Sequence, residues 1–302
     1  MNLLALVLAG GEGTRLHPLT QQHAKPALPF AAGRRIVDFV LSNLVNSEIS
    51  RICVLAQYKP ESLMEHIEFA WRSRFAAQGV SIEVALPQSR PDGAQYKGTA
   101  DAVYRNLDFV RRHSPDLVAV FAADHVYRMD VRQMVRFHRQ KRAEVTVAAV
   151  PVPLHMAPSF GILEMGRDGR VLGFAEKPQQ PVPMPQDAGR AFASMGNYLF
   201  EPRTLVTVLE QAVLRGGTDF GRDIMPGLVR SRRVLAYDFS GNRVPGVRPF
   251  EEAGYWRDVG TIESLAAARN DVLGPKPRFN LQNRQWPIHG TGLAALRDNA
   301  AA

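Results

Sequence analysis

The residues best suited to chemistry lie near the start of the chain, in a glycine-rich loop that follows an apolar run of strand length. Residues 3–8 are apolar, and the loop of residues 10–15 contains three glycines and ends in Arg15. Because glycine has no Cβ, such a loop can bring backbone N–H groups close to an anion at the carboxyl end of a buried strand. Arg15 and Lys25 add a planar and a mobile cation. The pattern indicates a phosphate-binding loop, and the alternative is a tight strand-to-helix turn with surface cations.

A carboxylate stands just past a second apolar run. Residues 117–122 are all apolar and Asp124 follows them, so Asp124 is expected at the same sheet edge as the glycine loop. Mg²⁺ prefers oxygen ligands, and one or two carboxylates together with substrate phosphates usually bind it. Asp124 is therefore a candidate Mg²⁺ ligand, with a turn or helix cap as the alternative. His125 is interpreted as a cap or as a neighbour of the ligand, and Asp258, next to Arg257, is on its own typical of a surface ion pair.

The first half of the chain alternates strand and helix patterns. The strands and helices that they predict must position the glycine loop and Asp124. Apolar runs predict strands, and apolar residues at helical spacing predict helices between them. The expected strands are residues 51–56, 81–86 and 117–122, and the expected helices are residues 36–46, 60–71, 99–112 and 130–141. Such alternation predicts an α/β fold with a Rossmann-like, doubly wound and mostly parallel sheet.

After Glu144, the expected elements no longer alternate regularly between strand and helix. A hairpin is expected over residues 161–177, around the turn at residues 167–169. Further strands are expected at residues 145–152, 193–200, 234–239 and 255–259, with helices at residues 202–213 and 261–273 and a proline-rich loop at residues 178–185. These segments predict an added antiparallel portion that could provide a wall for a second substrate.

Composition narrows the class of protein. The 302 residues are 45% hydrophobic and 22% charged, typical of a protein with a sizeable core. We expect a cytoplasmic protein without a membrane partner. The sequence has no run of eighteen apolar residues, no signal-peptide pattern and a single cysteine, Cys53. The net charge is +8, but the basic residues are scattered except at residues 230–233, and no DNA- or RNA-binding motif is present. We therefore expect no nucleic-acid partner.

The glycine loop and its surroundings resemble a known family. The loop, followed by Ala24, Lys25 and Pro26, has neither the dinucleotide-binding nor the P-loop spacing, and it resembles the sugar-1-phosphate nucleotidyltransferases. Residues 35–43 are similar to the helix that follows this loop in glucose-1-phosphate adenylyltransferases, and the resemblance extends from Leu3 to about Ile288. It implies an enzyme that forms ADP-glucose and pyrophosphate from ATP and α-D-glucose 1-phosphate, for glycogen or related α-glucan synthesis.

The resemblance also implies roles for particular residues. The implied catalytic residues are Arg15, Lys25 and Asp124, and the implied Mg²⁺ ligands are Asp124 and Asp258. The implied nucleotide-binding residues are Leu8, Ala9, Gly10, Gly11, Gly13, Thr14, Gln88, Tyr96, Gly98 and Thr99. The amide of Gln88 offers the donor and the acceptor that adenine needs, although a lone glutamine is otherwise a surface residue. By its residue type, Thr99 could also cap the following helix, and Gly98 could let the backbone approach a ligand.

The sugar phosphate is assigned to a second set of residues. The segment of residues 174–178 contains Glu176, which can accept hydrogen bonds from sugar hydroxyls, and Lys177, which can meet the sugar phosphate. By resemblance the sugar-phosphate-binding residues are Gly161, Glu176, Lys177 and Ser194. Without the resemblance, Glu176 and Lys177 would be a solvated charge pair at the exit of a hairpin. Ala123 stands where the family has glycine, a small departure beside Asp124.

Two other functions stay open on the sequence alone. One is a related nucleotidyltransferase that uses UTP, dTTP or GTP, because base choice depends on few contacts. The other is a non-catalytic regulatory subunit of the family, against which the five charged residues Arg15, Lys25, Asp124, Lys177 and Asp258 argue.

The ends of the chain suggest its organisation. Residues 1–274 are expected to form the catalytic domain and residues 275–302 a tail, the start of a linker to a C-terminal β-helix that the family usually has and that the remaining residues are too few to build. We accordingly expect a monomer or homodimer, or a chain that pairs with a second family subunit. Weak or no activation by sugar bisphosphates is expected too, because Gln22 stands where some members have lysine.

Overall fold

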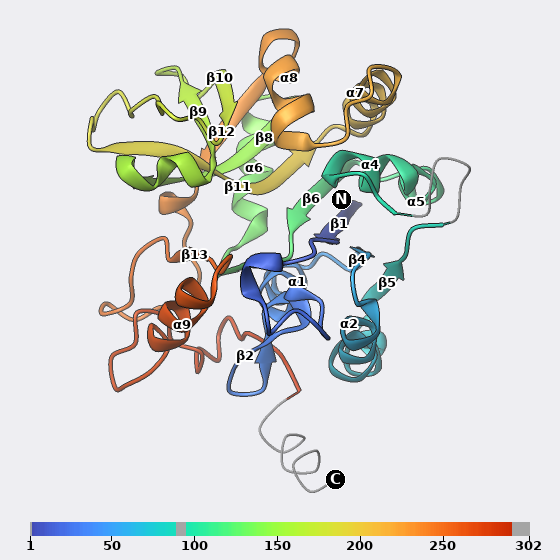
Figure 1. The fold of residues 1–302 in the computed structure, drawn as a ribbon, viewed down its shortest axis with the longest axis vertical. Coiled ribbons are helices and arrows are strands. Elements are labelled where there is room, and N and C mark those ends of the chain that lie inside the picture. The colour runs from blue at the N-terminus through green and yellow to red at the C-terminus, as the bar shows by residue number, and fades with distance from the viewer. Residues whose placement is uncertain (1, 89–94, 292–302) are drawn as a thin grey trace, which may run out of the picture. The chain divides into compact units, whose positions relative to one another are not determined.

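The computed structural model describes residues 2–88 and 95–291, and its helices and strands fall into two compact units (Figure 1). The first unit contains residues 1–6, 87–121 and 132–242, and the second contains residues 7–86, 122–131 and 243–302. Strand β1 (Leu3–Ala9) supplies residues to both, because the division falls after Leu6. The α/β class expected from the sequence is confirmed, and each unit is described in turn.

The strands of the first unit are organised around β11, which pairs antiparallel with β6, β8 and β9. In addition, β9 pairs antiparallel with β10, and β8 pairs parallel with β12. The bounds are β6 (Leu117–Ala122), β8 (Val145–Pro153), β9 (Gly161–Met165), β10 (Val171–Glu176), β11 (Arg190–Phe200) and β12 (Val234–Asp238). Strands β8 to β11 are the antiparallel portion that the second half of the sequence predicts, with β9 and β10 forming the predicted hairpin.

The helices of the first unit are α4 (Thr99–Arg105), α5 (Leu107–His113), α6 (Val131–Gln140), α7 (Pro202–Leu214) and α8 (Met225–Ser231), with a π-helical turn at Phe220–Ile224 and a 3-10 turn at Leu154–Ser159. Helices α6 and α7 follow the predicted ranges, α8 was not predicted, and the helix predicted over residues 99–112 is divided into α4 and α5. The single helix predicted over residues 99–112 is wrong, because it breaks at Asn106. The Asn106 amide donates to the carbonyl of Ala102 and to the hydroxyl of Tyr96, so its side chain competes with the regular helix.

The second unit contains the parallel pair β4 (Arg51–Ala56) and β5 (Ser81–Ala85), joined by helical turns. Its α-helices are α1 (Val37–Asn46), α2 (Pro60–Ile67), α3 (Ser73–Phe75) and α9 (Ile262–Asn270), with a π-helical turn at Glu68–Arg72. Two short antiparallel pairs, β2 (Pro29–Ala31) with β3 (Arg34–Arg35) and β7 (His125–Tyr127) with β13 (Trp256–Asp258), complete it. Strands β2, β3 and β7 were not predicted, because two or three residues are too few to show a strand period.

Part of the predicted tail packs into the second unit. Phe279, Leu281 and Ile288 belong to a buried cluster with Phe39 of α1 and Leu265 of α9. Burial of such side chains stabilises the unit by roughly 1.5–3 kcal/mol each. Residues 292–302 of that tail, like residues 89–94, lie outside the described part of the chain.

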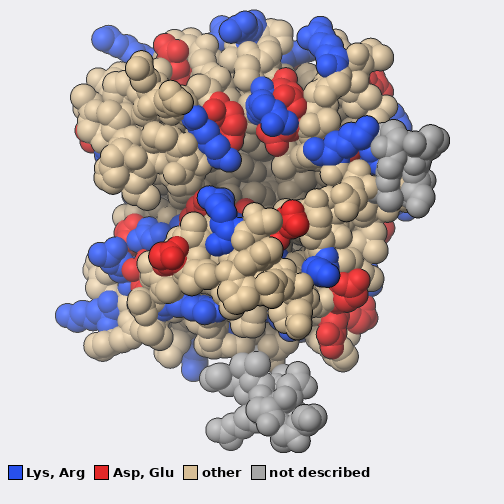
Figure 2. All heavy atoms as spheres, in the orientation of Figure 1, with Lys and Arg blue, Asp and Glu red and all other residues tan. Residues whose placement is uncertain are grey.

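Two surface features bear on possible partners. None of the helices formed by residues 2–88 and 95–291 is long and apolar enough to cross a membrane. On the face drawn in Figure 2, cationic and anionic side chains are interspersed. The net charge of +8 is therefore not gathered into one continuous basic patch on that face.

Candidate active site

The glycine loop of the second unit forms a tight turn that packs against Thr20 and Lys25. Gly13 has φ 69°, in the left-handed region that favours glycine, and precedes the 3-10 turn Thr14–Leu16 that carries Arg15. The Thr20 hydroxyl donates to the Gly13 carbonyl at 2.8 Å. A Cβ on Gly13 would lie 3.0 Å from Thr20 Cγ2 and 3.1 Å from Lys25 Cβ. The absence of a side chain at Gly13 therefore lets the loop pack directly against Lys25.

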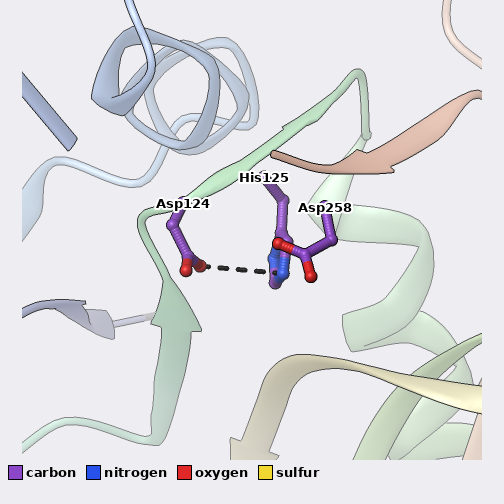
Figure 3. A group of neighbouring side chains, drawn as sticks. All are labelled: Asp124, His125 and Asp258. Carbon is purple, nitrogen blue, oxygen red and sulfur yellow. Dashed lines mark ion pairs between the residues drawn. The ribbon is translucent and has the colours of Figure 1, made fainter. Parts of the chain in front are cut away.

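Strands β7 and β13 bring the two candidate metal ligands of the second unit together. Asp124 immediately precedes β7, and Asp258 ends β13, where it pairs with His125. Figure 3 shows the three side chains converging, and one ligand atom of each lies within 4.8 Å of the others. His125 Nε2 lies 3.6 Å from Asp124 Oδ1, and its ring packs against Trp256 with centroids 5.0 Å apart. His125 thus belongs to the cluster itself, which is closer than the sequence indicated.

Lys25 joins this cluster to the glycine loop. Its Nζ lies 2.7 Å from Asp124 Oδ2 and 3.7 Å from Asp258 Oδ1, and the residue is only 6% exposed. Burial by itself would raise the pKa of Asp124, but the Lys25 ammonium and the His125 imidazole outweigh it and hold that pKa well below the usual value. Asp124 is therefore an anion at neutral pH, as a metal-binding carboxylate must be.

Arg15 reaches the same place because Gly260 has no side chain. A Cβ on Gly260 would lie 3.0 Å from an Arg15 guanidinium nitrogen and 3.2 Å from Asp258 Oδ1. Arg15, Lys25, Asp124 and Asp258 are thus close neighbours in the second unit. Arg257 does not pair with Asp258, as the surface-pair alternative required, because its guanidinium binds Glu252 and Asp271.

All four sugar-phosphate candidates lie in the first unit, and Gly161, Glu176 and Lys177 are close neighbours there. Glu176 ends β10 and pairs with Gly161 at the start of β9. A Cβ on Gly161 would lie 2.9 Å from Glu176 Oε2, and one on Gly221 only 2.4 Å from it. The carboxylate therefore fits between two glycines. Burial raises the pKa of Glu176, the negative charge of Asp219 raises it further, and Lys177 opposes both.

Ser194 and Lys177 have different surroundings in the same unit. The Ser194 hydroxyl accepts from the Gly196 amide at 3.2 Å and lies 3.4 Å from the Tyr198 hydroxyl. Burial raises the pKa of Tyr198 to about 12, with the Ser194 hydroxyl opposing and Glu176 adding to the rise. Lys177 has φ 47° and a side chain that is 62% exposed, 3.7 Å from Glu176 Oε1. Its ammonium is free of a buried partner and accessible to an anion in solvent.

The candidate nucleotide-binding segment of the first unit differs from the sequence interpretation at Thr99. Gly98, rather than Thr99, is the N-cap of α4, and it makes no side-chain cap hydrogen bond. Gly98 is packed against the chain itself, since a Cβ there would lie 2.5 Å from the Thr218 carbonyl oxygen. Tyr96 is buried and its hydroxyl accepts from Asn106, whereas Gln88 is exposed.

Residues 218–221 are the part of the site that sequence reasoning missed. This segment packs against Gly98 and Thr99 on one side and against Glu176 on the other. The signal that could have found it is the run of small, acidic, aromatic and glycine residues between α7 and α8, which has neither helical nor strand periodicity.

Known proteins similar to this chain in sequence identify its family. The sequence model of the nucleotidyl transferase family matches residues 4–274. The glucose-1-phosphate adenylyltransferase of Thermodesulfovibrio yellowstonii is 50% identical over 288 residues, which are 95% of this chain and 70% of the relative. The chain belongs to the glucose-1-phosphate adenylyltransferase family. The family's proteins from Streptomyces coelicolor, 46% identical over 99% of this chain and 75% of the relative, and Vibrio cholerae, 44% identical over 95% and 70%, also match.

Family membership confirms the resemblance drawn from the glycine loop and from residues 35–43. It classes the chain as a nucleotidyltransferase. The match covers both units, so the loop with its acidic cluster and the segment around Glu176 fall within residues shared with the family.

Proposed function

We propose that this chain is an enzyme that forms ADP-glucose and pyrophosphate from ATP and α-D-glucose 1-phosphate, in glycogen or related α-glucan synthesis. The observation that carries the proposal is the position of Lys25, against the glycine loop and between Asp124 and Asp258. A loop with exposed backbone N–H groups, two cations and two carboxylates is suited to transferring a nucleotidyl group. The names of the relatives support ADP-glucose as the product.

The chemistry needs little covalent work from the protein. An oxygen of the sugar phosphate attacks the α-phosphorus of ATP in line, and pyrophosphate leaves. Positioning and neutralisation of charge then supply most of the rate. The backbone at Gly10 and Gly11 would hold the triphosphate, while Arg15 and Lys25 would neutralise the charge that develops on the α-phosphoryl group and on the departing pyrophosphate.

The acidic cluster fits a divalent cation such as Mg²⁺. Two carboxylates, one just before β7 and one at the end of β13, present oxygens within 4.8 Å of each other, and the Lys25 ammonium already neutralises part of their charge. Asp124 and Asp258 would hold the ion, and His125 lies within reach to orient them. When bound, Mg²⁺ supplies charge stabilisation at the phosphoryl oxygens.

The residues around Glu176 would bind the sugar phosphate. The Glu176 carboxylate can accept hydrogen bonds from sugar hydroxyls, and Gly161 borders it. Ser194 lies beside Tyr198, on which the charge of Glu176 acts. The exposed ammonium of Lys177 would bind the phosphate as a point charge. Gln88 and Tyr96 would contact the nucleotide.

The decisive experiment measures pyrophosphate release by the purified chain with glucose 1-phosphate and each of ATP, UTP, dTTP and GTP. We expect release with ATP at least tenfold faster than with the other three. The Asp124→Asn variant, in which one metal-binding charge is lost, should reduce turnover by a factor on the order of a thousand while keeping the fold. Faster turnover with another nucleotide would assign the chain to a different branch, and no release with any would favour a non-catalytic subunit.

The setting of the enzyme is also part of the proposal. We place it in the cytoplasm, where its phosphorylated substrates are available, as a monomer or homodimer or paired with a second family subunit. Light scattering of the purified chain would measure the assembly, and a stable tetramer would contradict it.

A further inference from the structure

The hydroxyl of Thr99 is engaged within the protein. It donates to Asp219 Oδ2 at 3.0 Å and accepts from the backbone N–H of Phe220 at 2.9 Å. Both partners lie about 120 residues away in the sequence, in the segment of residues 218–221. A hydroxyl has one hydrogen to donate, so Thr99 has none left for a nucleotide while it makes these bonds.

Two further hydrogen bonds join the start of α4 to the same segment. The Thr218 carbonyl accepts from the N–H groups of Ala100 at 2.8 Å and Asp101 at 3.1 Å, both in the first turn of the helix. These donors have no partner within a helix, so residues 218–221 satisfy them in place of a capping side chain. Gly98 allows the approach, since a Cβ there would meet the Thr218 carbonyl at 2.5 Å.

The other side of residues 218–221 shapes the surroundings of Glu176. Gly221 lies so close that a Cβ on it would come within 2.4 Å of Glu176 Oε2. Phe220 is buried and stacks on Tyr198 with ring centroids 5.6 Å apart, and the charge of Asp219 acts on both Glu176 and Tyr198. A displacement of this segment would therefore move the wall against which the Glu176 carboxylate rests.

We propose that Thr99 is a positioning residue for the sugar-phosphate subsite: its hydroxyl fixes residues 218–221 against Glu176, although Thr99 itself lies in the segment assigned to the nucleotide. This inference rests on the proposed function. Thr99 acts through Asp219 and Phe220 and touches neither substrate.

The two hydrogen bonds of Thr99 have a direct consequence for substrate affinity. Removing the hydroxyl leaves the Phe220 N–H and one Asp219 oxygen without these partners, so the segment can move. The first turn of α4 stays helical, because the Thr218 carbonyl still accepts from Ala100 and Asp101. The affinity for glucose 1-phosphate should fall more than the affinity for ATP.

The test compares Thr99→Val, which keeps the branched shape and loses the hydroxyl, with Thr99→Ser, which keeps the hydroxyl. We expect Thr99→Val to raise KM for glucose 1-phosphate about tenfold, the order expected for losing one or two such hydrogen bonds, and KM for ATP by less than about threefold. Thr99→Ser should restore KM for glucose 1-phosphate to within about twofold of the unaltered chain. Circular dichroism melts of both variants establish that each is folded.

Three results would overturn the inference. They are a rise in KM for ATP that equals or exceeds the rise for glucose 1-phosphate, an unchanged KM for both substrates, and a Thr99→Ser variant as impaired as Thr99→Val. The first of these would return Thr99 to the nucleotide site and leave the proposed function standing. If the unaltered chain itself formed no ADP-glucose, the proposed function would fail and this inference with it.

Discussion

Replacing Gly221 by alanine should change the shape of the sugar-phosphate subsite without lowering the stability of the fold. The new Cβ would lie 2.4 Å from Glu176 Oε2, whereas ordinary contacts of a Cβ begin at 3.4 Å. The carboxylate oxygen must therefore move by about 1 Å, and a misplacement of that size can cost on the order of a hundredfold in rate. The Glu176 side chain is 31% exposed, so it can turn toward solvent without disturbing the backbone.

The expected result is a large kinetic effect with little change in stability. Loss of a hydrogen bond to a charged group costs about 1.5–3 kcal/mol, which corresponds to a rise of roughly tenfold to a hundredfold in KM for glucose 1-phosphate. Alanine is favoured over glycine in a helix by up to about 1 kcal/mol, and the substitution lies in the helical turn Phe220–Ile224. The melting temperature of Gly221→Ala should therefore stay the same or rise slightly. Steady-state kinetics with each substrate varied in turn, together with thermal unfolding, measure both quantities.

A matched control is available in the same unit. Gly227 of α8 has no atom within 4 Å of the position of a Cβ, so Gly227→Ala should leave KM for both substrates unchanged. If Gly221→Ala kept the KM of the unaltered chain for glucose 1-phosphate, the position of Glu176 between its two glycines would have no role in binding. A matching loss in Gly227→Ala would show that the effect is not local.

Three further predictions concern charged groups. Lys177→Ala should raise KM for glucose 1-phosphate at least about tenfold and KM for ATP little, in steady-state kinetics, because a cation that binds one phosphate acts on one substrate; an equal rise for both would contradict the assignment. Because the pKa of Glu176 is raised, the contribution of its carboxyl group to the free energy of unfolding depends on pH. That contribution is fully present below the ordinary glutamate pKa of about 4.3 and is lost as pH rises through the raised pKa. From pH 4 to 7, the melting temperature of the unaltered chain should therefore fall relative to that of Glu176→Gln. Melting temperatures that change in parallel would refute this. Arg128→Met should lower the free energy of unfolding in urea by about 3–5 kcal/mol, since it leaves Glu251, whose side chain is 2% exposed, without its ion pair at 3.0 Å. Adding Glu251→Met should restore much of the loss, and no recovery would point to packing instead.

The elements with long apolar runs could be predicted from the sequence. Strand β4 has the predicted bounds, residues 51–56, because a continuous buried run is bounded by polar residues on both sides. The break at Asn106 could not be predicted, since the helical period continues through it and only the side-chain bonds of Asn106 interrupt it.

The candidate site could be predicted residue by residue, but not its arrangement. Asp124 was recognised by its place after β6, whereas Asp258 depended on the family resemblance. Their convergence is produced by the pairing of β7 with β13, and β7, with only three residues, has no detectable period. Contacts across more than a hundred residues, such as Thr99 with Asp219, leave no local pattern at either end.

The central claim is that this chain transfers the adenylyl group of ATP to glucose 1-phosphate. The most direct measurement supplies the purified chain with Mg²⁺, glucose 1-phosphate and ATP labelled with ³²P at either the α- or the γ-phosphorus. We predict that the α-label enters ADP-glucose and that the γ-label appears in pyrophosphate, with Asp124→Asn forming neither product at a comparable rate. Transfer of the γ-label to the sugar phosphate, or no labelled ADP-glucose from the unaltered chain, would contradict the account.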